Sequence, residues 1–186
     1  MSSTRIRARL DCVGRYVYTA ARLVPHDPLC GAAARIVGRA VRARDRRLHV
    51  EHVGSTAVEG LPGKGIVDLL LTYPAGLLAE ARDVLAELGF QHQEFGKPFP
   101  EERPMRVGTV AVMGREYRVH VHVIAEDSPE AAALRRFRDQ LRADERLRLD
   151  YAERKRQLIE AGITESPDYA EAKGEFIVGA LQREAG

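Results

Sequence analysis

The stretch HVGSTAV at residues 52–58, followed after five residues by KGIVDLL at residues 64–70, decides the fold of this chain. Leu48 to Val53 has the pattern of a strand, and Ile66 to Thr72 begins a second strand directly after the loop. Glycine and proline are frequent in residues 59–65, which excludes regular structure there. The stretch therefore predicts two strands joined by a glycine-rich loop.

Three features of this stretch favour a phosphate site. Gly54-Ser55 lets the backbone turn sharply after a strand, and Ser55 or Thr56 as the cap of a short helix would leave N–H groups facing an anion. Lys64 adds a positive charge on the loop, and the Asp68 carboxylate is able to bridge a divalent cation to phosphate oxygens. Each feature alone is more often an ordinary turn or a structural carboxylate, but their combination favours phosphate binding.

A second polar group lies in a strand expected over Tyr117 to Ile124. Alternation puts Arg118, His120 and His122 on one face and the valines on the other, with the Cα atoms of the two histidines about 7 Å apart. If this face adjoins Asp68, a cation, two titratable rings and a carboxylate converge, which suits phosphate binding, metal ligation or acid–base chemistry. A solvent-facing side of an antiparallel sheet explains the spacing equally well.

The elements around these strands complete a mixed sheet with helices. An amphipathic helix is expected from about Pro28 to Asp45, and another from Pro74 to a cap at Gly89. Further strands are expected over Phe90–Phe95 and Arg106–Met113, and Val17–Val24 has the pattern of a short strand or helical turn. Strands joined by hairpins beside strands joined by a helix imply a mixed sheet.

The last third of the chain has a purely helical pattern. Ser128-Pro129 and Ser166-Pro167 are matching helix starts, each with an N-cap serine followed by proline. Residues 1–12 are expected to be loosely held. This order of predicted elements, with the sheet first and the helices last, indicates an α/β (α+β) fold in one compact body. Strands and helices do not alternate regularly, which argues against a doubly wound sheet.

Composition places the chain among folded globular proteins. It has 186 residues, of which 45% are hydrophobic and 30% are charged, and the purely apolar runs are only a few residues long. No run has the length of a signal peptide or a membrane span, and Cys12 and Cys30 belong to no paired motif. We therefore expect a cytoplasmic protein with reduced thiols and no membrane partner.

Charge is distributed unevenly along the chain. Residues 1–50 contain eleven Arg and three Asp, a net charge of +8, although the whole chain carries only +2. Arg35, Arg39, Arg42 and Arg46 share one face of the first predicted helix. The favoured explanation of these arginines is a solvated helix surface. Aromatic residues are few and Trp is absent, so nucleic acid is not favoured as a partner.

Taken together, these motifs resemble the GrpB family over about Val17 to Leu181. The resemblance is carried by the string from His52 to Leu61, Lys64 before Asp68, the 120–122 strand, and the later residues Phe137-Arg138-Asp139, Leu141, Tyr151, Lys155, Leu158, Tyr169, Lys173, Phe176 and Ile177. It implies a nucleotidyltransferase-like mixed β-sheet with flanking helices and a C-terminal helical extension, in a family also found fused to dephospho-CoA kinase. It divides the chain into an N-terminal extension at 1–16, a nucleotidyltransferase-like core at 17–127 and a helical region at 128–186.

The wider nucleotidyltransferase superfamily uses a Gly-Ser pair to hold the triphosphate and a strand with two acids, two positions apart, to hold metals. Gly54-Ser55 and Asp68 match those positions, but the second acid is replaced by Leu70. The family's usual Lys-Pro is Lys64-Gly65 here. One carboxylate is a weak magnesium site, so two-metal catalysis would need other donors such as Glu51 or the two histidines.

The resemblance and the motifs lead to one functional hypothesis and an alternative. The chain is expected to bind a nucleotide, a nucleotide-containing coenzyme or another phosphate-containing small molecule with a divalent metal, Mg²⁺ or Mn²⁺, and its catalytic form would transfer a nucleotidyl group. The alternative is a non-catalytic nucleotide-binding or protein-interaction module that has lost the second acid. Catalysis is assigned to Asp68, His120 and His122, metal binding to Asp68 and His122, and phosphate or nucleotide binding to His52, Gly54, Ser55, Thr56, Lys64 and Arg118.

Overall fold

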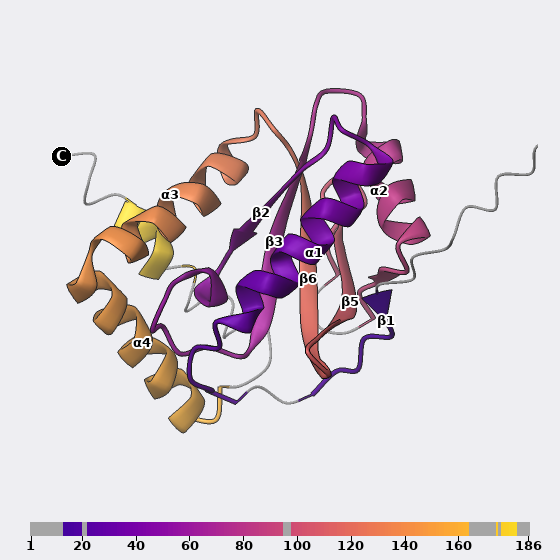
Figure 1. Ribbon diagram of the computed structural model, residues 1–186. Coiled ribbons are helices and arrows are strands. Elements are labelled where there is room, and N and C mark those ends of the chain that lie inside the picture. Colours follow the sequence, from indigo (N-terminus) through magenta and orange to yellow (C-terminus); the bar gives the residue numbers. More distant parts are fainter. Residues whose placement is uncertain (1–12, 20–21, 95–97, 164–173, 175, 182–186) are drawn as a thin grey trace, which may run out of the picture.

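A mixed six-stranded sheet forms the centre of the molecule (Figure 1). The structure is a computed structural model that describes residues 13–19, 22–94, 98–163, 174 and 176–181. The sheet has the order β1-β5-β6-β3-β2, with β4 also paired to β5, and β3 and β6 are its parallel pair. Its strands are β1 (Val13–Gly14), β2 (His49–Val53), β3 (Ile66–Tyr73), β4 (Gln91–His92), β5 (Met105–Val112) and β6 (Arg115–Ala125). The predicted mixed sheet is therefore confirmed.

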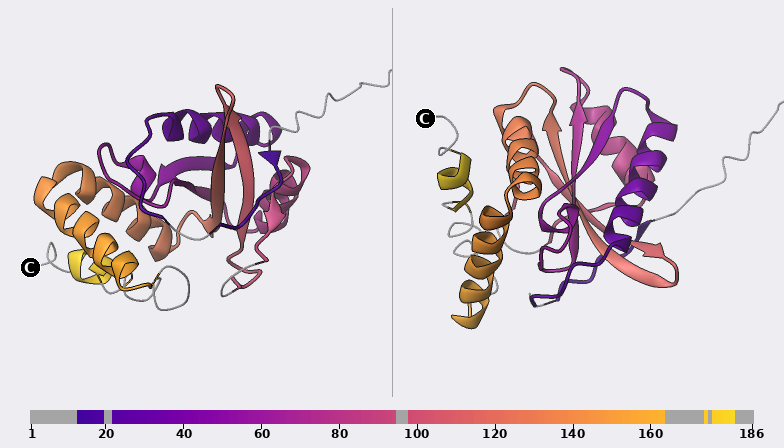
Figure 2. Two further views of the ribbon diagram at one scale, coloured as in Figure 1. Left: turned by 90° about the horizontal axis from the view of Figure 1, so that it is seen from below. Right: turned by 60° about the vertical axis from the view of Figure 1, so that its left-hand side comes forward.

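Helices cover the two faces of this sheet (Figures 1 and 2). One face packs against α1 (Leu29–Arg44) and α2 (Leu78–Glu87), and the other is covered in part by α3 (Pro129–Ala143), which α4 (Glu145–Glu160) follows. The Ser128 hydroxyl accepts a hydrogen bond from the Glu130 N–H at 3.2 Å, so the predicted start of α3 is correct. No helix in the described part of the chain is long and apolar enough to cross a membrane.

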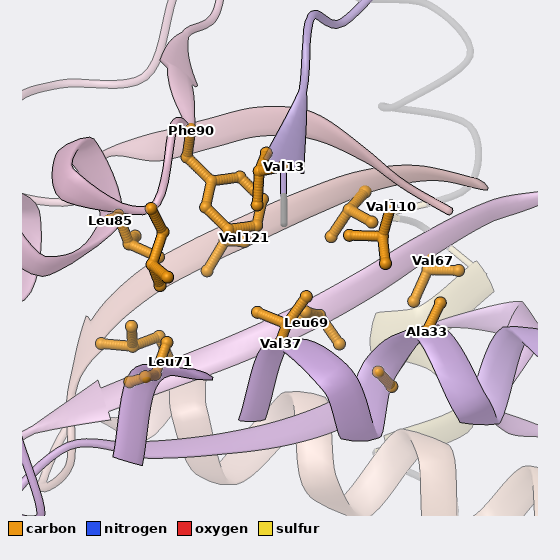
Figure 3. Packing of buried hydrophobic residues seen from close by; sticks show 14 of the residues in the cluster. Val13, Ala33, Val37, Val67, Leu69, Leu71, Leu85, Phe90, Val110 and Val121 are labelled. Carbon is orange, nitrogen blue, oxygen red and sulfur yellow. The ribbon is translucent and has the colours of Figure 1, made fainter. Parts of the chain in front are cut away.

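Strand alternation builds the core under α1 and α2. Val67, Leu69 and Leu71 of β3 and the valines of β6 point into this core, where Val37 of α1 and Leu85 of α2 meet them (Figure 3). The alternate side chains of the same strands, including Asp68, His120 and His122, consequently lie on the opposite face. The predicted segregation of valines from polar residues along β6 is confirmed.

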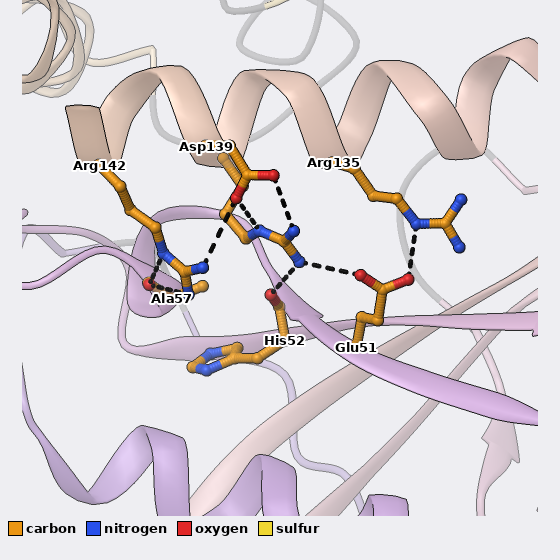
Figure 4. Close-up of polar contacts among 7 residues, drawn as sticks. Glu51, His52, Ala57, Arg135, Asp139 and Arg142 are labelled. Carbon is orange, nitrogen blue, oxygen red and sulfur yellow. Dashed lines mark hydrogen bonds and ion pairs between the residues drawn. The ribbon is translucent and has the colours of Figure 1, made fainter. Parts of the chain in front are cut away.

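Arginines of α3 attach the helical layer to the edge strand β2. Arg135 Nε donates to Glu51 Oε1 at 2.6 Å, and Arg138 Nη1 donates to Glu51 Oε2 at 3.1 Å (Figure 4). Arg142 donates through Nε and Nη2 to the Ala57 carbonyl at 3.1 and 2.9 Å. These contacts place α3 directly beside the chain segment that carries Gly54 and Ser55.

Several predicted boundaries are wrong. The segment Val17–Val24 forms no strand or helix in its described part, where only Val24 bridges Gly63. The strand expected over Phe90–Phe95 is limited to β4, and Val13–Gly14, within the predicted extension, pairs with β5. Alternation alone could neither find β1 nor limit β4 to its two residues, since two residues carry no periodic signal. The predictions for residues 1–12, with Cys12, and for Ser166-Pro167, Tyr169 and Lys173 lie outside the described residues; Cys30 is a free, buried thiol.

Candidate functional site

Gly54 forms the sharp turn at the end of β2. Its φ of +70° and ψ of −170° lie in a region that L-residues avoid. A Cβ atom at this position would lie 2.5 Å from Asp68 Oδ2 and 2.9 Å from Asp68 Cβ. Glycine is therefore required twice, by the backbone conformation and by the Asp68 carboxylate that rests against the turn. Ser55–Ala57 follows as the short 3₁₀ turn η1.

Asp68 lies on the sheet face away from α1, at the centre of a cluster of polar residues that we call the Asp68 cluster. Its partner across the parallel pair is His120, while Leu70 is paired with His122. Asp68 Oδ1 is 3.8 Å from His120 Nδ1 and 4.0 Å from His122 Nε2, and the Asp68 side chain is 26% exposed. The structure thus brings the carboxylate and both predicted imidazoles together beside the Gly54-Ser55 turn.

Tyr16 and Arg118 extend this cluster toward the N-terminal segment. The Tyr16 hydroxyl is 2.9 Å from His120 Nε2, and the two rings lie 5.4 Å apart at their centroids. Burial raises the pKa of Tyr16, and the nearby Arg118 guanidinium opposes that shift, so the phenol is neutral at pH 7. Arg118 Nη2 donates to the Lys64 carbonyl at 3.1 Å, and Nη1 donates to the hydroxyl of Thr19. Arg118 therefore links the Lys64 loop to the N-terminal segment.

Lys155 of α4 places a buried positive charge beside Ser55. Its Nζ donates to Ser55 Oγ at 3.1 Å and to the Pro62 carbonyl, and it lies 4.5 Å from the centroid of the Tyr151 ring. Only 2% of Lys155 is exposed. Sequence analysis used Lys155 for the family resemblance but gave it no role. Its position four residues after the buried Tyr151 and three before Leu158, on the apolar side of the helix, was the available signal.

His52 and the Thr56 hydroxyl lie on the α1 side of β2, away from the Asp68 carboxylate. His52 is paired with Leu69, whose side chain faces α1, so the imidazole and Asp68 point to opposite faces. The Thr56 hydroxyl donates to the Ile66 carbonyl at 3.0 Å and lies 3.0 Å from His52 Nε2, which must therefore carry the ring hydrogen. Burial, together with the positive charge of Arg142, lowers the pKa of His52 to about 4. The structure does not bring these two predicted phosphate ligands to the Asp68 cluster.

The donors around Asp68 do not fit a pair of magnesium ions. Leu70 stands where the second acid would be, and its side chain is fully buried among Val53, Ile124 and Ala131. The described residues include no group of three or more His, Cys, Asp or Glu side chains arranged to hold a metal ion. Asp68 with one of the two imidazoles is a set of two donors, which suits a manganese or zinc ion better than magnesium, because magnesium prefers oxygen ligands. A bound ion would have to complete its coordination with oxygens of a ligand.

Sequence comparisons find relatives over most of the chain. The family model described as "GrpB protein" matches residues 20–183. A UPF0157 protein of Streptomyces coelicolor is 36% identical over 134 residues, covering 72% of this chain and 67% of that protein. A dephospho-CoA kinase of Mycobacterium leprae is 29% identical over 194 residues, covering 90% of this chain but only 47% of the kinase. The chain thus spans about half the length of that relative.

Solved structures are similar at the level of the fold. The conserved protein GrpB from Enterococcus faecalis superimposes with a TM-score of 0.67 at 21% identity, over 89% of this chain and all of that one. Cid1, in a structure with its short product ApU, superimposes with a TM-score of 0.51 at 14% identity, over 73% of this chain and 42% of Cid1. The fold is therefore nucleotidyltransferase-like, as the resemblance implied.

Proposed function

The chain belongs to the GrpB family, and we propose that it binds a nucleotide or a nucleotide-containing coenzyme at the Asp68 cluster. The cluster consists of Gly54, Ser55, Asp68, Arg118, His120 and His122, with Lys155 behind Ser55. The observation that carries the proposal is the contact between Lys155 Nζ and Ser55 Oγ. It places a buried cation and a hydroxyl beside the turn that carries the Asp68 carboxylate.

The charges of this site suit a phosphate group next to a divalent cation. Lys155 and Arg118 supply positive charge to phosphate oxygens, and a hydroxyl such as that of Ser55 provides a hydrogen-bonding group. Asp68, with an imidazole from His120 or His122, would hold one divalent cation, which when bound neutralises phosphate charge. Arg118 donates a hydrogen bond to the backbone carbonyl of Lys64, which keeps Lys64 near the cluster. We therefore include Lys64 among the phosphate-binding residues.

The proposed function is binding without two-metal transfer. Nucleotidyl transfer by two metals needs acids that hold both ions, and the position of the second acid is the buried Leu70. The name of the Mycobacterium leprae relative supports testing dephospho-CoA and coenzyme A beside the nucleoside triphosphates.

Thermal denaturation with added ligand tests the proposal. ATP, GTP, CTP, UTP, dephospho-CoA and coenzyme A are each added with Mn²⁺, with Mg²⁺ or with a chelator. A ligand at 100 times its Kd stabilises the folded state by about 2.7 kcal/mol. We expect at least one ligand to stabilise the protein more with Mn²⁺ than with the chelator, and no release of pyrophosphate from a triphosphate.

Two variants locate the binding. Asp68→Asn should abolish the metal-dependent part of the shift, whereas Asp150→Asn, which removes an exposed carboxylate of α4, should leave it intact. Lys155→Met should weaken binding with or without metal, because it removes the cation beside Ser55. Equal shifts in the wild type and in Asp68→Asn, or no shift with any ligand, would overturn the proposal.

A further inference from the structure

A second polar site runs along the edge strand β2, between α1 and α3 (Figures 1 and 4). It is an open groove of about 1920 Å³. Its walls come mainly from residues 23–28, α1, β2, the η1 turn with the loop that follows, and α3. The Asp68 carboxylate and the imidazoles of His120 and His122 do not line it. This groove is therefore separate from the proposed nucleotide site.

One wall carries three of the four arginines in the predicted stripe. Arg35, Arg39 and Arg42 are exposed and line the groove, and none forms an ion pair with another described residue. The first and last of them are seven positions apart in α1, which is about 10.5 Å along the helix axis at 1.5 Å per residue. Arg46 lies beyond the end of α1 and outside the lining. The wall is thus a row of cations with free hydrogen-bond donors.

The remaining charges of the groove leave an excess of positive charge. Arg142 extends the cationic lining from α3, where it donates to the Ala57 carbonyl and lies 3.6 Å from a carboxylate oxygen of Asp139. Glu51, Glu59 and Glu126 also line the groove, but Glu51 is already paired with Arg135 and with Arg138. The pKa of His52, which lies in the lining, is lowered by burial and further by Arg142, Arg138 and Arg35. The groove is therefore a favourable environment for an anion.

We propose that this groove binds the phosphate backbone of a nucleic acid strand without reading its bases. An open groove of this size exceeds the roughly 300–1,000 Å³ of pockets that enclose small ligands. A row of arginines matches a chain of phosphates, and contacts of this kind position a strand without selecting its sequence. The described lining contains no Phe, Tyr or Trp, the large aromatic side chains on which the bases of a single strand stack. The low number of aromatic residues made nucleic acid an unfavoured partner in the sequence analysis. That argument applies to the stacking of bases and does not apply to contacts with the phosphate backbone.

Fluorescence anisotropy over a range of NaCl concentrations tests this site. The probes are a labelled deoxythymidine strand of about 20 nucleotides, a deoxycytidine strand of the same length and a duplex, and the wild type should bind both single strands equally. Each phosphate contact contributes about 0.7 to the slope of log K against log salt for single strands. The triple variant Arg35→Gln, Arg39→Gln, Arg42→Gln should therefore lower the magnitude of that slope by about 2.

A matched control separates the groove from total charge. Arg15→Gln, Arg136→Gln, Arg146→Gln removes three exposed arginines elsewhere, with the same change in net charge, and should leave the slope unchanged. Asp68→Asn should also bind the strands as the wild type does, which distinguishes this site from the proposed nucleotide site. The inference is overturned if the control loses as much slope as the groove variant, if Asp68→Asn abolishes binding, or if inorganic tripolyphosphate binds as tightly as the strands.

Discussion

Adjacent residues of β3 show how differently the two faces of one sheet are used. Leu69 is fully buried under α1 and α2, in a core made of aliphatic side chains and a few aromatic rings. Asp68 points to the other face, where two imidazoles, a glycine turn and a tyrosine surround a partly exposed carboxylate. The first face stabilises the fold through apolar burial, and the second face leaves polar groups accessible to a ligand. The same strands supply both, because neighbouring side chains point in opposite directions.

Leu70 is the exception on the polar face, and it gives the largest expected effect. It lies on the same face as Asp68, but Ala131 and Leu134 of α3 cover it. Leu70→Asp would bury a carboxylate under the apolar side chains that cover this position, so we expect a loss of about 3–5 kcal/mol in the free energy of unfolding. Urea denaturation measures this loss.

The control for Leu70 keeps the volume and omits the charge. Leu70→Met should cost less than about 1.5 kcal/mol, because it changes shape only slightly. If Leu70→Asp were as stable as Leu70→Met, the polar face would extend under α3, and the comparison of the two faces would be wrong.

Leu69→Ala and Asp68→Asn compare the faces directly at neighbouring positions. Leu69→Ala leaves a cavity in the core and should lower the free energy of unfolding by about 2–5 kcal/mol. Asp68→Asn replaces a partly exposed carboxylate by an amide of the same shape and should change it by less than about 1 kcal/mol. Denaturation curves of both variants in one buffer give the two values. A larger loss for Asp68→Asn would mean that Asp68 stabilises the fold.

Gly54 connects the two roles, since the fold and the site both depend on it. Gly54→Ala should lower the free energy of unfolding by about 3 kcal/mol, from the strained φ of +70° and from the contact with Asp68. Gly60→Ala is the matched control, because Gly60 has a φ of +74° but open space around its Cβ position; we expect about 1 kcal/mol there. Equal losses in thermal or chemical denaturation would show that Asp68 does not press against Gly54.

His52 contributes to stability in a way that depends on pH. The folded pKa of about 4 lies below the ordinary value of 6.5, so the unfolded chain binds more protons between these values. The stability that the neutral imidazole contributes is complete above pH 6.5 and is lost as the pH falls toward 4. This loss should be about 2–3 kcal/mol.

His52→Gln removes this titration and keeps an N–H donor for Thr56. Free energies of unfolding measured across this pH range should therefore decline less steeply in the variant than in the wild type. Parallel curves would indicate that His52 has the same pKa in the folded and the unfolded chain, and that the groove is less positive than the structure indicates.

Much of the fold could be predicted from patterns within a few residues. The long strands β3, β5 and β6, the helices α1, α2 and α3 and the Ser128 cap follow from hydrophobic periodicity and from helix-start residues. The strand β1 was missed and β4 was predicted too long, because pairing with β5, not local pattern, defines these two-residue strands. In the site, the placement of His120 and His122 with Asp68 followed from alternation once β6 is known to lie beside β3.

Other parts of the site depend on long-range contacts. Tyr16 meets His120 across 104 positions of the chain, and Lys155 meets Ser55 across 100. No periodic pattern relates such residues. His52 points away from Asp68 because β2 pairs His52 with Leu69 and Val53 with Asp68, a register that only the folded sheet defines. These are the side chains whose roles sequence analysis left out or misplaced.

Local chemistry was readable without coordinates: glycine at a turn that no other residue tolerates, a period of two along β6, and a serine before the proline that starts α3. Those features depend on steric limits and hydrogen bonds within a few residues, so they are written into the order of residues. The covering of Leu70 by α3, the seating of Lys155 at Ser55 and the groove beside the arginines of α1 required the folded chain. They arise when distant segments bury surface against one another, and the free energy of that burial depends on which faces meet.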